Sequence, residues 1–269
     1  MNKYFLITLA LVSNLFSFAQ IPQDQIVHRP GLLYKSVQIG ANYYKAPKKI
    51  VPGDFGTGFF VKKKNHYYLV TAYHILTERS SQDTSILFYP ITPNLIAVRF
   101  HSKKGDSTVV GVFFLFNRLG RRKFYSVPYK NGKSVLDVAI LPIDSIPSGA
   151  IIDPIDLASI DTTFAINSFS ELYVCGYREE VEFRAILPTI DTVKSLPPNV
   201  FNYNDSLILA TSFKNITLHG SSGGPVYTDI NGRPQIVGIC SREMPAKEHT
   251  LPTFIFISIS ELRRHFHFY

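Results

Sequence analysis

Short apolar segments that favour β-strands recur along the whole chain. They are rich in β-branched and aromatic residues, and clusters of Gly, Pro, Asn, Asp and Lys separate them at intervals of about ten residues. In the first half these segments are 36–44, 56–63, 66–72, 85–90, 95–102, 108–116 and 136–143. In the second half they are 171–177, 181–190, 206–213, 223–229, 235–241 and 253–260. This spacing predicts an all-β fold, either a sandwich or a barrel.

The segment 143–168 separates the two series of predicted strands. It contains Pro147 and Pro154 and has no sustained period of hydrophobic residues. We therefore expect a connector at 143–168, with one β unit over residues 20–142 and a second over residues 169–269.

The end of the chain differs from these strands and predicts one short helix. Ser258 and Glu261 stand three residues apart, which is the spacing of a capping box at a helix start. Leu262 and Phe266 stand four residues apart, so they would lie on one face of that helix.

The first 19 residues have the pattern of a cleavable signal peptide. Lys3 precedes an apolar stretch that Ser13 and Asn14 interrupt, and a small-x-small motif at residues 17–19 follows. This stretch falls short of the ~20 apolar residues of a membrane-spanning helix, so an uncleaved anchor is the less favoured alternative. We expect residues 1–19 to be removed, the protein to be exported (periplasmic or secreted), and no membrane span to remain.

The charge of the chain is basic but not concentrated. There are 28 Lys and Arg against 20 Asp and Glu, and the formal net charge is +8. The basic runs at 62–64 and 121–123 are short, whereas nucleic-acid-binding proteins usually gather such residues on one face. We therefore expect no nucleic-acid partner.

Cysteine and histidine residues give little indication of metal or redox chemistry. Cys175 and Cys240 lie in apolar strand segments, where they are either two buried thiols or, in an oxidising compartment, one disulfide. His265 and His267 stand at the end of the chain without the spacing of a zinc motif. We expect no metal and no other cofactor, and the oligomeric state stays open.

The segment HGSSGGPV, residues 219–226, is the strongest candidate for catalytic chemistry. Its Gly-x-Ser-x-Gly pattern around Ser222 also occurs in α/β-hydrolases, where a helix follows the serine directly. Gly223, Gly224 and Pro225 oppose a helix, and too little chain follows to supply the acid and the histidine that come next in those enzymes. The partners of Ser222 would therefore have to lie upstream.

His74 and Asp137 have suitable contexts upstream. His74 follows an apolar segment in YYLVTAYHIL, and Asp137 begins another in DVAIL. Together with GTGFFV and GSSGGPV, these segments resemble the trypsin-like (chymotrypsin-fold) serine peptidases over about residues 50–260, most closely the secreted bacterial members. The resemblance implies two six-stranded antiparallel β-barrels with a short C-terminal helix, the first barrel carrying His74 and Asp137 and the second carrying Ser222.

The resemblance also implies a role for each of these residues. Ser222 is the nucleophile, His74 accepts its proton and delivers it to the leaving amine, and Asp137 orients the imidazole. The backbone N–H groups of Gly220 and Ser222 form the oxyanion hole. The expected substrate is a protein or peptide, and the expected reaction is hydrolysis of a peptide bond through an acyl-enzyme.

A second group of residues is implied to bind the substrate. The segment 240–243 would pair with the peptide as an added strand, and side chains around it would line the first specificity pocket. Glu243 stands where many relatives have glycine, so it narrows this pocket, attracts a basic side chain or points to solvent. The implied substrate-binding residues are Ile216, Thr217, His219, Cys240, Ser241, Arg242 and Glu243.

Two positions depart from the family pattern. Ser221 stands before the nucleophile, where the family usually has Asp or Asn. It cannot form the ion pair with a freed N-terminus that activates the zymogens of the family. Tyr73 stands before the histidine, where a small residue is usual.

Two functions of different classes follow from these patterns. One is an exported serine endopeptidase that works through His74, Asp137 and Ser222. The other is a catalytically silent protease-like module that binds peptides or partner proteins, because a fold alone does not establish an activity. The sequence favours the endopeptidase, since a silent descendant is free to lose any of the three residues and none is missing.

Overall fold

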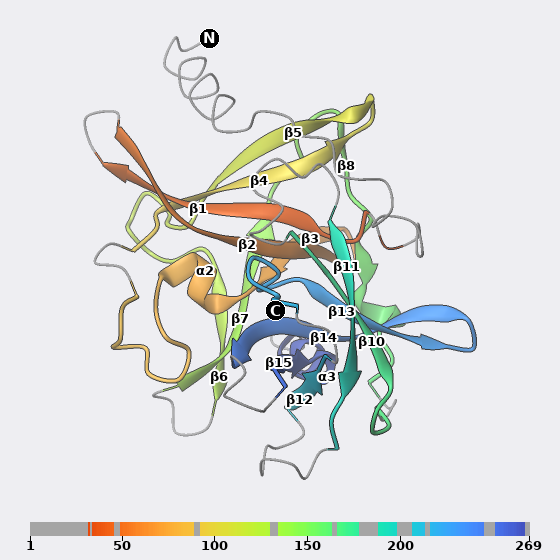
Figure 1. Ribbon diagram of the computed structural model, residues 1–269. Coiled ribbons are helices and arrows are strands. Elements are labelled where there is room, and N and C mark those ends of the chain that lie inside the picture. Colours follow the sequence, from red (N-terminus) through yellow and green to blue (C-terminus); the bar gives the residue numbers. More distant parts are fainter. Residues whose placement is uncertain are drawn as a thin grey trace.

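Two β-sheet units follow one another along the chain (Figure 1). The computed structural model describes residues 32, 34–45, 49–88, 92–129, 134–162, 166–177, 188–197, 206–212, 216–244 and 251–266. The predicted signal peptide lies outside these residues. Within them, no helix has both the length and the apolar character needed to cross a membrane.

The N-terminal unit is a nine-stranded sheet. Its main path runs β5-β4-β1-β2-β3-β7-β6, while β8 pairs with β4 and β9 pairs with β2. Its strands are β1 (Val37–Lys45), β2 (Lys49–Lys63), β3 (His66–Thr71), β4 (Leu95–Ser102), β5 (Gly105–Phe114), β6 (Tyr125–Tyr129), β7 (Ser134–Ile143), β8 (Ala150–Ile151) and β9 (Ile155–Asp156). Its helices are α2 (Tyr73–Thr77) and the 3-10 helix η3 (Leu157–Ser159).

The C-terminal unit is a closed barrel in the order β10-β11-β12-β15-β14-β13. All neighbouring strands in it are antiparallel. Its strands are β10 (Glu171–Gly176), β11 (Thr189–Ser195), β12 (Leu207–Thr211), β13 (Pro225–Ile230), β14 (Arg233–Met244) and β15 (Thr253–Ser258). Helix α3 (Ile259–His265) follows the barrel.

The all-β fold and the short C-terminal helix are confirmed, whereas the first unit has more strands than the six expected. In the predicted connector 143–168, β8 pairs with β4 and β9 pairs with β2, so these residues extend the first sheet. β6 also has no counterpart in the predicted strands. The predicted strand at 181–190 lies mostly outside the described residues, and β11 begins at Thr189.

The strand predicted at 85–90 is wrong in its described part. Leu87 forms only an isolated β-bridge with Arg79. The apolar side chains that suggested a strand do not enter the core, because Ile86 is 52% exposed and Phe88 is 56% exposed. Composition favours a strand here, but the described part of this segment pairs with no neighbouring strand beyond that bridge.

Helix α3 begins with the predicted cap, although the capping box is not formed as expected. The hydroxyl of Ser258 accepts the backbone N–H of Ser260. The carboxylate of Glu261 instead accepts a hydrogen bond from the hydroxyl of Ser206, at 3.0 Å. The helix is therefore capped by Ser258 and tied by Glu261 to the segment before β12.

A hydrophobic cluster joins the two units. It combines side chains from β2, β3 and β7 of the first sheet with side chains from β10, β13, β14 and β15 of the barrel. Helix α3 contributes Leu262, and Phe266 at its end packs edge-on against Tyr68 of β3, with 4.9 Å between ring centroids. Because burial of this apolar surface is favourable, the two units are held in one arrangement.

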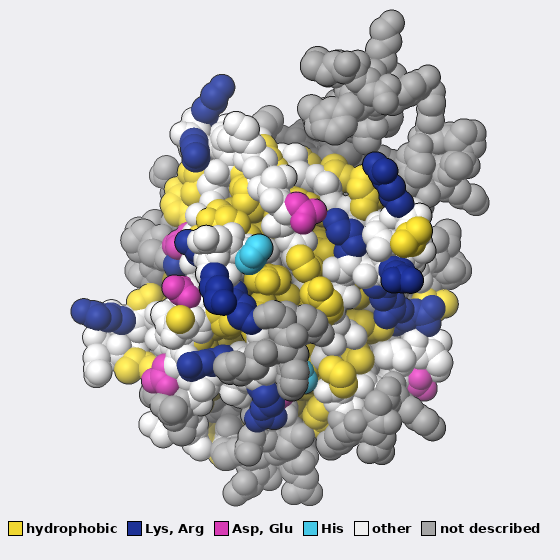
Figure 2. Space-filling model, turned by 180° about the vertical axis from the view of Figure 1, so that it is seen from behind, with side chains coloured by type: hydrophobic (Ala, Val, Ile, Leu, Met, Phe, Trp, Pro, Cys, Tyr) yellow, Lys and Arg dark blue, Asp and Glu magenta, His cyan; other side chains and the backbone are white. Residues whose placement is uncertain are grey.

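Figure 2 shows the face of the molecule opposite to the view of Figure 1. Lys and Arg side chains stand in several separate places on this face, with Asp and Glu side chains between them. On this face the described basic side chains are therefore spread out, in agreement with the short basic runs of the sequence.

Thr57 on β2 links the first sheet to the segment 220–222 of the second unit. Its backbone N–H donates to the carbonyl of Ser222 at 2.8 Å. Its hydroxyl donates to the carbonyl of Gly220 at 2.8 Å and accepts the backbone N–H of Tyr177 at 2.9 Å. Thr57 and Tyr177 are buried, so water does not replace these bonds, and the position of 220–222 depends on Thr57.

Replacing Thr57 with valine removes the hydroxyl while keeping the shape of the side chain. The Gly220 carbonyl and the Tyr177 N–H then lose a partner, and each such buried group costs about 1–3 kcal/mol. We expect Thr57→Val to lower the free energy of unfolding by about 2–4 kcal/mol in urea denaturation. Thr57→Ser keeps the hydroxyl and should lose about 1 kcal/mol, the value of one buried methyl group. Equal losses in the two variants would contradict this role.

Candidate active site

A cavity of about 450 Å³ lies where the two units meet, and its lining comes from both. Helix α2, the segment after it and β7 supply one side, and residues 218–222 with β14 supply the other. The lining includes Asp54, Phe55, His74, Ser80, Ser81, Phe88, Asp137, Leu218, His219, Gly220, Ser222, Cys240, Ser241, Arg242 and Glu243. Nine of the predicted site residues are in this set, so residues remote in sequence share one cavity.

The turn after β3 positions His74. Strand β3 ends at Thr71 and the five-residue helix α2 begins at Tyr73, so His74 stands in its first turn. Glu78 ends the helix in the left-handed conformation, with φ of 54°, and its backbone N–H donates to the carbonyl of His74 at 2.7 Å. The strand end and the helix end therefore both fix the backbone of His74.

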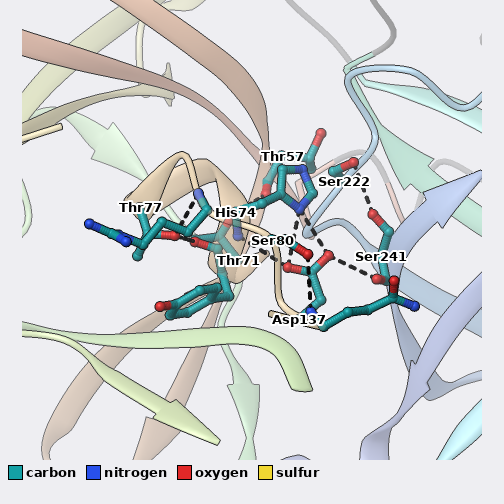
Figure 3. Close-up of polar contacts among 11 residues, drawn as sticks. Thr57, Thr71, His74, Thr77, Ser80, Asp137, Ser222 and Ser241 are labelled. Atoms are coloured by element: carbon teal, nitrogen blue, oxygen red, sulfur yellow. Dashed lines mark hydrogen bonds and ion pairs between the residues drawn. The ribbon is translucent and has the colours of Figure 1, made fainter. Parts of the chain in front are cut away.

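Asp137 on β7 lies directly beside His74 (Figure 3). The Nδ1 atom of His74 is 2.9 Å from Oδ2 of Asp137 and 3.1 Å from Oδ1. The backbone N–H of His74 also donates to Oδ1, at 3.1 Å. Because an ionised carboxylate only accepts hydrogen bonds, the proton of the neutral imidazole lies on Nδ1, and Nε2 keeps a free lone pair.

Ser241 gives Asp137 a further partner. Its hydroxyl donates to Oδ2 of Asp137 at 2.8 Å, and Asp137 is only 5% exposed. A buried carboxylate is stable when it is paired and hydrogen-bonded, and Asp137 has both kinds of partner. The sequence implied only substrate binding for Ser241. Its hydrogen bond to Asp137 is visible only in the folded structure.

The electrostatics of the pair follow from this geometry. Burial by itself would lower the pKa of the His74 imidazole, but the charge and the hydrogen bond of Asp137 outweigh it and raise that pKa above 6.5. Burial would raise the pKa of Asp137, but the charge of His74 and the hydrogen bonds from His74 and Ser241 lower it below 3.8. Asp137 therefore stays ionised when His74 gains a proton.

A glycine-rich loop brings Ser222 to the same cavity. Gly220 and Gly223 have φ of 82° and 85°, in the left-handed region that favours glycine. At Gly223 a side chain would also collide with the backbone of Thr57 and Ala72. The N–H of Gly223 donates to the carbonyl of Cys240 at 2.7 Å, which fixes the loop against β14.

Two backbone N–H groups of this loop stay available. Among the described residues, the N–H groups of Gly220 and Ser222 donate to no acceptor. Gly220 and Ser222 both line the cavity. Such unengaged donors are suited to stabilise a negatively charged oxygen.

The hydroxyl of Ser222 donates to the backbone carbonyl of Ser241, at 3.1 Å (Figure 3). In the described part of the chain, no hydrogen bond joins it to His74. A rotation about the Cα–Cβ bond of Ser222 redirects the hydroxyl within the cavity that both side chains line. Catalytic hydrogen bonds commonly tighten only when substrate binds, so this arrangement is compatible with a nucleophile at rest.

The structure places the predicted substrate-binding residues differently. His219 and residues 240–243 line the cavity, Ile216 packs against the core of the barrel, and Thr217 donates its hydroxyl to Glu243 at 3.0 Å. Beyond Ile239, β14 pairs with β15 but no longer with β13, so one edge of residues 241–244 is open in the described structure. An open strand edge beside the cavity is able to pair with an extended peptide.

The two cysteines are free thiols and both are buried. They therefore form no disulfide with each other, which decides between the two alternatives that the sequence left open. Burial raises the pKa of the Cys240 thiol above its ordinary value, so this thiol stays protonated and has little nucleophilic character.

Some residues near the site carry no signal in the sequence. Glu78 is buried, its Oε1 accepts the backbone N–H of Asp54 at 2.9 Å, and burial raises the pKa of its carboxyl group. Asp54 itself lines the cavity. Thr57 does lie in the GTGFFV segment, but only the fold reveals its bonds to the Ser222 loop.

Comparison with known families agrees with this architecture. The family model of the trypsin-like peptidase domain matches residues 56–239, which is more than half of the chain. The comparison with curated proteins gives no match. The matched span includes His74, Asp137 and Ser222, and the expected similarity to secreted bacterial members stays a prediction. The chain belongs to the family of trypsin-like peptidase domains.

Proposed function

We propose that this protein is an exported serine endopeptidase that hydrolyses peptide bonds through an acyl-enzyme. The observation that carries the proposal is the hydrogen-bonded pair of His74 and Asp137, which opens on the same cavity as Ser222. Family membership supports peptides or proteins as the substrate class. The pattern of residues 1–19 supports export.

In the acylation step, the Ser222 Oγ attacks the carbonyl carbon of the scissile bond. Nε2 of His74 takes the hydroxyl proton, and the carboxylate of Asp137 stabilises the imidazolium without taking a proton itself. When the tetrahedral intermediate collapses, the C–N bond breaks and His74 delivers its proton to the leaving amine. The acyl group is left on Ser222 as an ester.

Deacylation repeats these steps with water. His74 removes a proton from the water that attacks the ester, and it returns a proton to Ser222 as the acid product leaves. In both steps the negative charge on the carbonyl oxygen is stabilised by the N–H groups of Gly220 and Ser222, and each donor is worth about 3 kcal/mol. The open edge of residues 241–244 holds the peptide extended beside Ser222.

Reaction with a fluorophosphonate tests whether Ser222 is an activated nucleophile. We expect intact mass spectrometry to show one adduct per chain on the purified protein and none on Ser222→Ala. Ser221→Ala is the matched control and should keep the adduct, because the Ser221 hydroxyl is buried and does not line the cavity. A folded protein without an adduct would favour the silent binding module instead.

The pH dependence of this reaction tests the role of His74. Only the neutral imidazole accepts the Ser222 proton, and its pKa is raised above 6.5. The rate of phosphonylation should therefore fall as pH decreases, with a midpoint above pH 6.5. Asp144→Asn removes an exposed carboxylate outside the cavity and should leave the midpoint unchanged. A midpoint at or below 6.5 contradicts this electrostatic account.

Asp137→Asn tests the contribution of the buried carboxylate. Asparagine fills the same space but cannot stabilise the imidazolium or hold the proton on Nδ1. We expect the phosphonylation rate constant to fall by about 10⁴-fold, the loss typical of this substitution in a Ser-His-Asp triad. A change of less than about tenfold, in a variant whose circular dichroism is unchanged, would remove Asp137 from the mechanism.

A further inference from the structure

Glu243 on β14 is half-buried, and one of its carboxylate oxygens is bound by neighbouring residues. Its Oε2 atom accepts the backbone N–H of Leu218 at 2.9 Å and the hydroxyl of Thr217 at 3.0 Å. Leu218 and Glu243 both line the cavity, and they belong to two different segments, the loop before Ser222 and strand β14. The side chain of Glu243 therefore reaches from β14 to residues 217–218 at the edge of the cavity.

The contact of Glu243 with residues 217–218 lies close to the reacting serine. Ser241, two residues before Glu243, accepts the hydrogen bond of the Ser222 hydroxyl through its carbonyl. In the proposed complex the peptide pairs with the open edge of residues 241–244, so the side chain of the residue before the cleaved bond lies beside β14 and residues 217–219. The side chain of Glu243 already occupies part of that space. Leu218 is buried, so displacing the carboxylate would leave its N–H without a partner.

We propose that the side chain of Glu243 blocks part of the first specificity pocket and restricts this pocket to small, uncharged side chains such as those of alanine, serine and glycine. This inference rests on the proposed function and adds the class of peptide that is cut. Of the roles that the sequence left open for Glu243, we favour narrowing of the pocket over attraction of a basic side chain.

Two features favour this steric role. The Oε2 atom of Glu243 already accepts two hydrogen bonds, from Thr217 and Leu218, and these bonds hold the carboxylate against residues 217–218 and limit how far it can turn toward a lysine of the substrate. Arg242 lies beside Glu243 in the cavity lining and adds a positive charge that opposes a cationic side chain. Shape, more than charge, then decides what enters.

A matched set of peptides tests the proposal. The peptides differ only in the residue before the cleaved bond, which is Ala, Leu, Phe or Lys, and kcat/KM is measured for the protein, Glu243→Gln and Glu243→Gly. Active protein is counted by fluorophosphonate titration, and thermal unfolding shows whether each variant is folded. Glu243→Ala serves as a second shortened variant if the glycine variant does not fold.

The unchanged protein should cut after Ala at least about tenfold faster than after Leu, Phe or Lys, as expected when a pocket is too short for the larger side chains. Glu243→Gln keeps the length and an acceptor oxygen, so this ratio should stay within about threefold. In Glu243→Gly or Glu243→Ala the blocking side chain is missing. The ratio of kcat/KM for the Ala peptide to kcat/KM for the Leu or Phe peptide should therefore fall by at least about tenfold.

Other results overturn the proposal. If the unchanged protein cuts best after Lys and Glu243→Gln loses this preference, the charge of Glu243 selects the substrate. If the shortened variants keep the original ranking, Glu243 does not limit the pocket. If Ser222 reacts with the fluorophosphonate but the ranking differs, only the pocket proposal fails, whereas absence of that reaction in all the proteins ends the proposed function and the pocket proposal together.

Discussion

The hydrogen bonds of Thr57 are the contact on which the site depends. One residue of β2 binds the carbonyls of Gly220 and Ser222 and the N–H of Tyr177, so the first sheet holds the loop that carries the serine. His74 follows β3, which pairs directly with β2. Because these contacts are buried, the histidine and the serine keep a fixed spacing although they belong to different units.

The second requirement is a buried negative charge with enough partners. Asp137 is almost completely buried, and the backbone N–H and ring of His74 together with the hydroxyl of Ser241 satisfy its oxygens. The same contacts fix the tautomer of His74 and raise its pKa. Ser241 also accepts the Ser222 hydroxyl through its carbonyl, so one residue of β14 touches both the acid and the serine. Packing and chemistry are therefore served by the same few bonds.

Local sequence was sufficient for most strands, because each lies in a short segment with its own pattern. Three such segments also pointed to His74, Asp137 and Ser222, which the structure brings to one cavity, and their catalytic roles stay a prediction. Contacts between remote segments could not be predicted. Ser241 and Asp137 are 104 residues apart, and the direction of the Glu243 side chain depends on where residues 217–218 lie. The apolar residues at 86–88 favoured a strand, but they are exposed and form only one β-bridge in the described structure. These features come from tertiary structure and leave no local pattern.

A crystal structure of the phosphonylated protein would show whether Ser222 reacts in the geometry described. We expect phosphorus bonded to Ser222 Oγ, one phosphonyl oxygen within hydrogen-bond distance of the N–H groups of Gly220 and Ser222, and His74 still bound to Asp137 through Nδ1. A phosphonyl group on another residue, or a phosphonyl oxygen that contacts neither N–H group, would contradict it.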